Sequence, residues 1–101
     1  MEIKALKALA HPIRREIMEA LRSGAKTSGE LAELFDASWP TVSRHLATLK
    51  EADLITAERR ATSILYRANT SVLEDAAAAV MALIRADDGQ DLDDDMKEAA
   101  E

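Results

Sequence analysis

The chain opens with apolar residues at helical spacing. A short first helix, to about residue 10, is predicted by Ile3, Leu6 and Leu9. Pro12 then fits the first turn of a second helix, because the first helical position tolerates a missing N–H. We expect this helix to end at Gly24, since glycine readily adopts the left-handed conformation of a helix end.

An extended link over residues 25–27 is expected to lead into a third, short helix. Ser28 is a favourable N-cap for this helix. Its predicted buried stripe is Leu31, Leu34 and Phe35. Residues 36–38 then form a tight turn.

A fourth helix is predicted from Trp39 to Ala52, with Ser38 as its N-cap. At about 100° per residue, its core positions are Val42, Leu46 and Leu49. The opposite side carries Pro40, Arg44, Ala47 and Glu51, with Thr41, Ser43, Thr48 and Lys50 on the flanks.

The period changes from helical to alternating after Asp53. Residues 54–60 and 63–68 predict two strands joined around Ala61. Ser71 and Glu74 have capping-box spacing and open a fifth helix to about residue 86. The fold class is mainly α with a two-stranded β-wing. Its order is four helices, a hairpin and a fifth helix, which is a winged helix-turn-helix.

Charge is distributed unevenly over the 101 residues, whose net charge is −6. Residues 1–68 hold 11 basic and 9 acidic side chains, whereas residues 69–101 hold 2 basic and 10 acidic ones. We expect one domain over residues 1–86 and an acidic, disordered tail over residues 87–101. An overall acidic charge does not exclude DNA binding, which depends on charge at the contact surface.

Composition excludes several function classes. The chain has no Cys, which excludes disulfides and thiolate metal sites. No apolar run approaches the ~20 residues that span a bilayer, so we expect a cytoplasmic protein without membrane insertion. No phosphate-binding loop or nucleophile–base pair is present, since Ser43 and His45 do not face each other on a helix. We therefore expect no enzyme activity, no cofactor and no metal.

The outward face of the fourth helix suits a DNA major groove. Arg44 offers a forked donor for guanine, while hydroxyls bond base edges or phosphates and small residues permit close approach. Trp39 could contact DNA or cover the core edge, and His45 could contact a phosphate or pack inside. The predicted DNA-binding residues here are Ser38, Trp39, Pro40, Thr41, Ser43, Arg44, His45 and Lys50.

The predicted wing tip, residues 59–63, carries two arginines. Arg59 and Arg60 at the tip, with Arg67 on the returning strand, could bind the DNA backbone or the minor groove. The alternative is a solvated turn. Arg14 and Arg15 are weaker phosphate candidates, and we expect at least one of them to be structural.

The fifth helix is apolar over too wide an arc for a single interface. Pairing with its symmetry mate and with the first helix predicts a homodimer. The predicted interface residues are Ile3, Leu6, Leu9, Val72, Leu73, Ala76, Ala77, Val80, Leu83 and Ile84. The fourth helices of the two subunits would then lie in the major groove at two half-sites about 34–36 Å apart on a palindromic operator.

Three runs resemble the ArsR/SmtB family of winged-helix repressors, nearest to its SdpR-like autorepressor branch. They are LKALAHPIRREIMEAL, SGELAELFDASWPTVSRHLATLKEADLI and ERRATSILYRANTSVLED. The resemblance implies a dimeric, autoregulatory repressor whose partner is double-stranded DNA. It also implies that Trp39, Pro40, Ser43 and Arg44 face the groove. The family's Cys and His metal motifs are missing, so the effector is unknown. Asp53 stands where the family commonly has Gly after this helix, which implies a left-handed residue at the helix end.

The main alternative is a winged-helix protein-interaction module that does not bind DNA. The segment expected to contact DNA, residues 37–67, carries a net charge of only +2. This weak positive charge keeps the alternative open.

Overall fold

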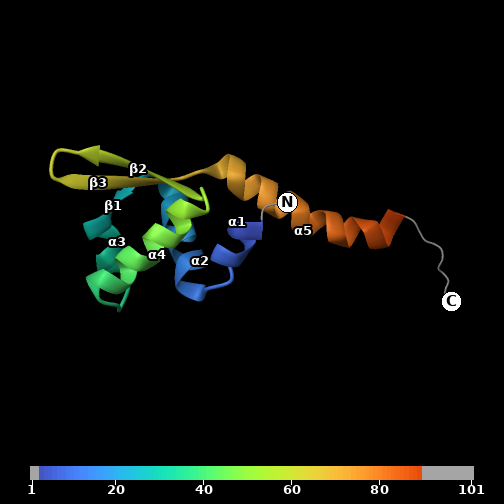
Figure 1. The fold of residues 1–101 in the computed structure, drawn as a ribbon, viewed down its shortest axis with the longest axis horizontal. Helices are drawn as coiled ribbons and strands as arrows, with labels where there is room; N and C mark the ends of the chain where they lie inside the picture. Colours follow the sequence, from blue (N-terminus) through green and yellow to red (C-terminus); the bar gives the residue numbers. More distant parts are fainter. Residues whose placement is uncertain (1–2, 90–101) are drawn as a thin grey trace.

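A computed structural model describes residues 3–89, which form five α-helices and a small sheet at one side of the helical body (Figure 1). In chain order the elements are α1 (Ile3–Ala8), α2 (Pro12–Ala20), the 3-10 turn η1 (Leu21–Ser23), β1 (Lys26–Thr27), α3 (Ser28–Leu34), α4 (Trp39–Glu51), β2 (Ile55–Arg60), β3 (Ser63–Ala68) and α5 (Thr70–Gly89). The predicted winged-helix class and helix order are confirmed. None of the described helices has the length and apolarity needed to cross a membrane.

The sheet has three strands in the order β1-β3-β2, and the predicted count of two is wrong. β1 pairs antiparallel with β3, placing Lys26 opposite Tyr66 and Thr27 opposite Leu65. The additional strand falls within residues 25–27, for which a link is expected, because two residues carry no detectable alternation. The pairing gives partners to backbone groups on one edge of β3 and ties the wing to the helices.

The start of α3 differs from the prediction by one residue. Thr27, and not Ser28, is the N-cap: its hydroxyl accepts a hydrogen bond from the Glu30 N–H at 3.2 Å. The Glu30 carboxylate in turn accepts one from the Thr27 N–H at 2.8 Å. This capping box gives partners to two backbone donors at the helix start and joins α3 directly to β1.

The bounds of α5 also differ from the prediction. The helix begins at Thr70, before Ser71, and continues to Gly89, beyond the expected end near residue 86. Asn69 precedes it and accepts a backbone hydrogen bond from Leu73. The rest of the predicted acidic tail, residues 90–101, lies outside the described residues.

Aliphatic side chains from the helices and the hairpin form one core. The largest fully buried ones are Ile17, Leu31, Val42, Leu46, Leu49, Leu54 and Ile55. Leu34 was predicted to be buried but is 57% exposed. The reason is that α3 ends at Leu34, and the extended residue Phe35 packs against the core in its place.

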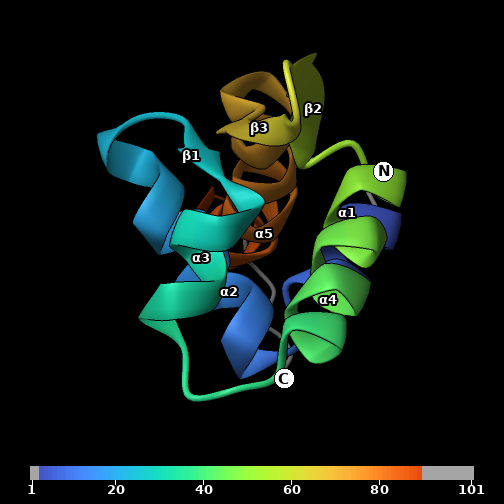
Figure 2. The ribbon, with the colours of Figure 1, turned by 90° about the vertical axis from the view of Figure 1, so that its left-hand side faces the viewer.

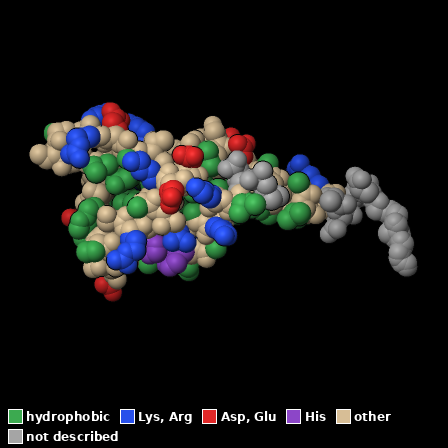
Figure 3. Space-filling view, in the orientation of Figure 1, with side chains coloured by type: hydrophobic (Ala, Val, Ile, Leu, Met, Phe, Trp, Pro, Cys, Tyr) green, Lys and Arg blue, Asp and Glu red, His purple; other side chains and the backbone are tan. Residues whose placement is uncertain are grey.

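The fifth helix packs on the rest of the chain only along its first turns (Figure 1). Ala76 is buried, and Val72 and Leu73 pack against the core. Beyond them the exposed apolar residues are Val80, Met81, Leu83 and Ile84. Hydrophobic side chains accordingly line the part of α5 that extends away from the body (Figure 3).

Candidate nucleic-acid interface

One side of α4 lies in the core and the other faces solvent. Val42, Leu46 and Leu49 are at most 1% exposed, which confirms their predicted inward direction. The exposed residues of the helix are Trp39, Pro40, Ser43, Arg44, Ala47, Lys50 and Glu51. Figure 2 shows α4 along an outer edge of the body, with α1 behind it. The helix is therefore held from within while its outer surface stays open.

The N-terminus of α4 is closed by hydroxyl groups. Ser38 Oγ accepts a hydrogen bond from the Thr41 N–H at 3.4 Å, and the hydroxyls of Ser38 and Thr41 lie 3.0 Å apart. The predicted N-cap is thus confirmed. Trp39 is 47% exposed, too much for a residue that only covers the core. Of the two roles considered for Trp39, its exposure favours surface contact.

Arg44 lies on the exposed side of the first half of α4. Its backbone carbonyl accepts a hydrogen bond from the Thr48 hydroxyl at 3.2 Å. Its guanidinium has no hydrogen-bond partner among the side chains of residues 3–85, so its N–H groups are available to a ligand. The adjacent residues Ser43 and Ala47 are small, which permits close approach to this surface.

His45 lies on the inner flank of α4 rather than on its open face. Its Nδ1 accepts a hydrogen bond from Arg14 Nη1 at 3.3 Å, and its ring centroid is 4.4 Å from that of His11. Burial, followed by the charges of His11, Arg14 and Arg44, lowers the pKa of His45. These contacts favour the packing role over the predicted phosphate contact.

His11 has a structural role that sequence analysis missed. Its Nδ1 accepts a hydrogen bond from the Ile13 N–H at 3.2 Å, and it is the N-cap of α2. The signal was present in the sequence, because Pro12 at the first helical position marks the preceding residue as the cap. Both histidines therefore use Nδ1 as an acceptor, which requires that nitrogen to be unprotonated.

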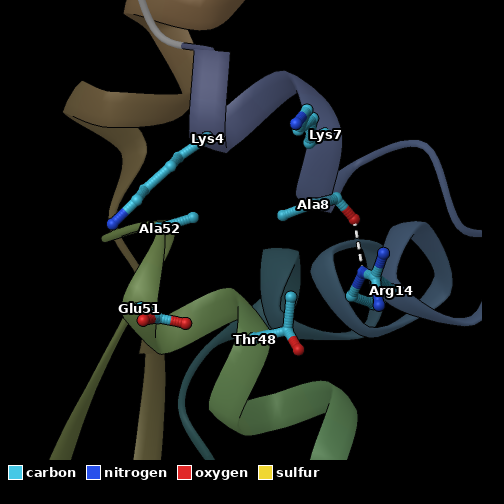
Figure 4. A pocket seen from close by; sticks show the side chains of 7 residues that line it. All are labelled: Lys4, Lys7, Ala8, Arg14, Thr48, Glu51 and Ala52. Carbon is cyan, nitrogen blue, oxygen red and sulfur yellow. Dashed lines mark hydrogen bonds between the residues drawn. The ribbon is translucent and has the colours of Figure 1, made fainter.

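Arg14 and Arg15 hold the end of α1. Arg14 Nε donates to the Ala8 carbonyl at 2.6 Å (Figure 4), and Arg15 Nη1 donates to the Leu9 carbonyl at 2.8 Å. These carbonyls lie at or just beyond the last turn of α1, where helical partners are lacking. The prediction that at least one of the two arginines is structural is confirmed for both.

The wing separates its two tip arginines. In the β2–β3 register Arg59 lies opposite Ile64 and Arg60 lies opposite Ser63. Side chains alternate along a strand, so Arg59 shares the face of the buried Ile55, which is the side of the helical body. Arg60 belongs to the outer face.

On that outer face Arg60 is paired with a carboxylate. Its Nε donates to Glu58 Oε2 at 3.0 Å, and this hydrogen bond is the main cause that lowers the pKa of Glu58. Arg67 shares the outer face and contributes to the same shift. Arg60 and Arg67 thus lie near a negative charge. Arg59 is exposed and has no hydrogen-bond partner within the described segment.

Residues 11–57, from the cap of α2 into β2, match the family described as bacterial regulatory protein, arsR family. The transcriptional repressor SdpR of Bacillus subtilis (strain 168) is 44% identical over 69 residues, which are 68% of this chain and 77% of that repressor. The chain belongs to the ArsR family. This confirms the resemblance drawn from the sequence.

Other members are similar over shorter or more divergent stretches. The HTH-type transcriptional repressor SmtB of Mycobacterium tuberculosis (strain ATCC 25618 / H37Rv) is 40% identical over 61% of this ArsR-family chain, which spans only 46% of that repressor. A solved structure of a possible transcriptional regulator for arsenical resistance superposes with a TM-score of 0.76 at 32% identity. It covers 80% of this chain and 84% of the other.

The similarity places this ArsR-family chain among transcriptional regulators. Its relatives are named as repressors and not as enzymes, which confirms the expectation that the chain is not an enzyme. The family match includes all of α4 but ends before the wing tip. Contact of individual residues with DNA stays a prediction, as does the cytoplasmic location.

Proposed function

We propose that this chain is a sequence-specific DNA-binding transcriptional repressor whose α4 reads the major groove. The observation that carries the proposal is the exposed Arg44, free of side-chain partners within residues 3–85 and flanked by Ser43 and Ala47. An arginine in this setting can donate two hydrogen bonds to guanine. The wing would contact the flanking backbone or minor groove through Arg59, on the helical side of the hairpin.

We further propose that the repressor acts as a homodimer on a palindromic operator. Support comes from the apolar residues of α5 that the single chain leaves exposed, together with the exposed Ile3 of the neighbouring α1. Ala76 is buried in the protomer and adds nothing to this surface. The predicted interface residues Leu6, Leu9, Val72 and Leu73 are also partly buried against the core. The proposed interface therefore narrows to the exposed residues Ile3, Ala77, Val80, Leu83 and Ile84, to which the exposed Met81 is added. A two-fold axis through it would present two α4 helices to two half-sites.

A mobility-shift assay tests DNA binding. Because autoregulation is implied by the resemblance to SdpR, the first probe is the DNA upstream of the protein's own gene, with random DNA as competitor. With ~6–8 phosphate contacts, log affinity should fall with log salt at a slope of about −5 to −7. A purified protein that ignores every duplex at low salt would refute the proposal and favour the protein-interaction alternative.

The substitution Arg44→Ala tests whether Arg44 contacts a base. Loss of a bidentate base contact should cost ~1–3 kcal/mol on the operator and relax the sequence preference at one position. The control is Arg22→Ala, because Arg22 is an exposed arginine in η1 away from α4. This variant should keep the operator affinity and the sequence preference unchanged. An equal loss for Arg44→Ala on operator and random DNA would make Arg44 a phosphate contact.

Light scattering tests the dimer. Val80→Asp places a charge in the proposed interface and should yield monomers, because an unpaired buried charge is costly. Ala82→Asp introduces the same charge on the opposite side of α5 and should leave a dimer. Dimers that survive Val80→Asp but not Ala82→Asp would place the interface on the other face of the helix.

A further inference from the structure

A small cavity lies between α1 and the C-terminal half of α4 (Figure 4). Its volume is about 210 Å³. The lining residues relevant here are Lys4, Lys7 and Ala8 of α1, Arg14 of α2, and Glu51 and Ala52 at the end of α4. Neither Ser43 nor Arg44 contributes, so the cavity is distinct from the proposed DNA-reading face.

The cavity is positively charged. Three of its lining residues are cationic and only Glu51 is anionic. Among the side chains of residues 3–85 the ion pair closer than 4.0 Å is that of Arg60 and Glu58, on the wing. The lysines and Arg14 are therefore not neutralised by a carboxylate of the described chain. Such an unpaired cluster favours an anionic ligand.

Arg14 is held in place before any ligand arrives. Its Nε donates to the Ala8 carbonyl at 2.6 Å, and its Nη1 donates to His45 Nδ1 at 3.3 Å. Among the described side chains, residues 3–85, its Nη2 has no partner. A guanidinium fixed by two hydrogen bonds loses little freedom on binding, and its remaining edge suits a carboxylate.

The other walls and the size restrict the class of ligand. The largely buried Ala8 and Ala52 lie at the floor of the cavity, and the methylene stems of the two lysines provide most of its apolar surface. Sites for drug-sized ligands measure roughly 300–1,000 Å³, so this cavity takes something smaller. We propose that it is an effector site for a small organic monocarboxylate with an apolar body.

The position of the cavity explains how such a ligand would act. It spans α1, next to the proposed dimer surface, and α4, the proposed reading helix. Arg14 also connects the cavity to His45, which belongs to α4. A bound carboxylate would therefore bias how α4 sits against α1. This regulatory step rests on the proposed function, whereas ligand binding itself does not.

Ligand binding is tested without DNA by NMR titration of ¹⁵N-labelled full-length protein with sodium benzoate. We expect saturable shifts at millimolar ligand, concentrated at the backbone amides of Lys7, Ala8, Arg14, Glu51 and Ala52. Benzamide, which lacks the charge, and acetate, which lacks the ring, should bind more weakly. No saturable shift with benzoate, or equal shifts with benzamide, would overturn the proposal.

Two substitutions at the cavity should act with opposite signs. Lys4→Gln combined with Lys7→Gln should weaken benzoate binding by about fivefold, whereas Glu51→Gln, which removes the opposing carboxylate, should strengthen it by about twofold. Lys26→Gln, a lysine outside the cavity, is the matched control and should change nothing. If these residues had only a structural role, the changes in benzoate affinity would not have opposite signs. Equal changes in all variants would therefore refute the assignment.

The regulatory step is tested by measuring operator affinity in benzoate and in chloride at equal ionic strength. We expect a change of about fivefold or more that the Lys4→Gln, Lys7→Gln variant loses. Equal affinities would overturn the regulatory role. A protein that binds benzoate but no DNA would refute the proposed function and leave the ligand site standing.

Discussion

Asp53 follows the C-terminus of α4 in a conformation that favours glycine. Its φ is 61°, in the left-handed region. The Asp53 N–H donates to the Lys50 carbonyl at 2.9 Å and the Leu54 N–H donates to the Leu49 carbonyl at 3.0 Å, and Leu49 and Leu54 are both fully buried. This is a Schellman motif with its hydrophobic contact, and Asp53 occupies the position usually taken by glycine.

We predict that Asp53→Gly stabilises the domain. A side chain in the left-handed region costs about 1–2 kcal/mol, somewhat less for Asp, whose side chain can bond locally. Glycine offsets part of this gain, since it loses about 0.5–1 kcal/mol more on ordering. Removing an anion from the negative end of the α4 dipole adds to the gain. The net effect should be about 1 kcal/mol, or roughly 4–8 °C in Tm for a domain of this size.

Thermal and urea unfolding measure this effect, with two control variants. Asp53→Asn removes the charge but keeps a side chain that tolerates φ > 0, and isolates the dipole contribution. Asp53→Ala removes the charge without relieving the backbone, and should be less stable than Asp53→Gly by about 1 kcal/mol. Equal stability of the Gly and Ala variants would refute the reasoning from backbone conformation. DNA affinity should stay unchanged, since Asp53 follows the reading helix.

Three further predictions address the cap, the histidine cluster and the wing. Thr27→Ala should cost ~1 kcal/mol in urea unfolding, because it removes the capping box of α3, whereas Ser28→Ala should be nearly neutral. The lowered pKa of His45 means that the unfolded chain binds more protons, so stability should be full above the unfolded pKa near 6.5 and fall as pH drops through the folded value. His45→Gln, which keeps an acceptor for Arg14, should flatten this dependence in pH-dependent unfolding; an unchanged profile would assign it to other groups. Arg59→Gln should reduce the slope of log affinity against log salt by about 1. Arg60→Gln should reduce this slope less, because Arg60 is already paired with Glu58. Equal changes would contradict the separation of the two faces.

Local pattern alone located most elements of this protein. Helical spacing identified α4, its inward residues Val42, Leu46 and Leu49, and its N-cap Ser38. These features depend on neighbours within one or two turns, so periodicity and capping chemistry reveal them. The left-handed conformation of Asp53 is implied by the family resemblance and not by local spacing, and its φ of 61° confirms it.

Tertiary structure decided what depends on residues far apart in the chain. The strand at Lys26–Thr27 exists only because β3 passes beside it, and a two-residue segment carries no periodicity of its own. The sequence leaves His45 open between a phosphate contact and packing, because its partners Arg14 and His11 come from about thirty residues earlier. Ala76 and Val80 share one helical stripe, yet only the first reaches the core, because α5 extends beyond the body. Local spacing determines which residues share a face, whereas the path of the rest of the chain determines what that face meets.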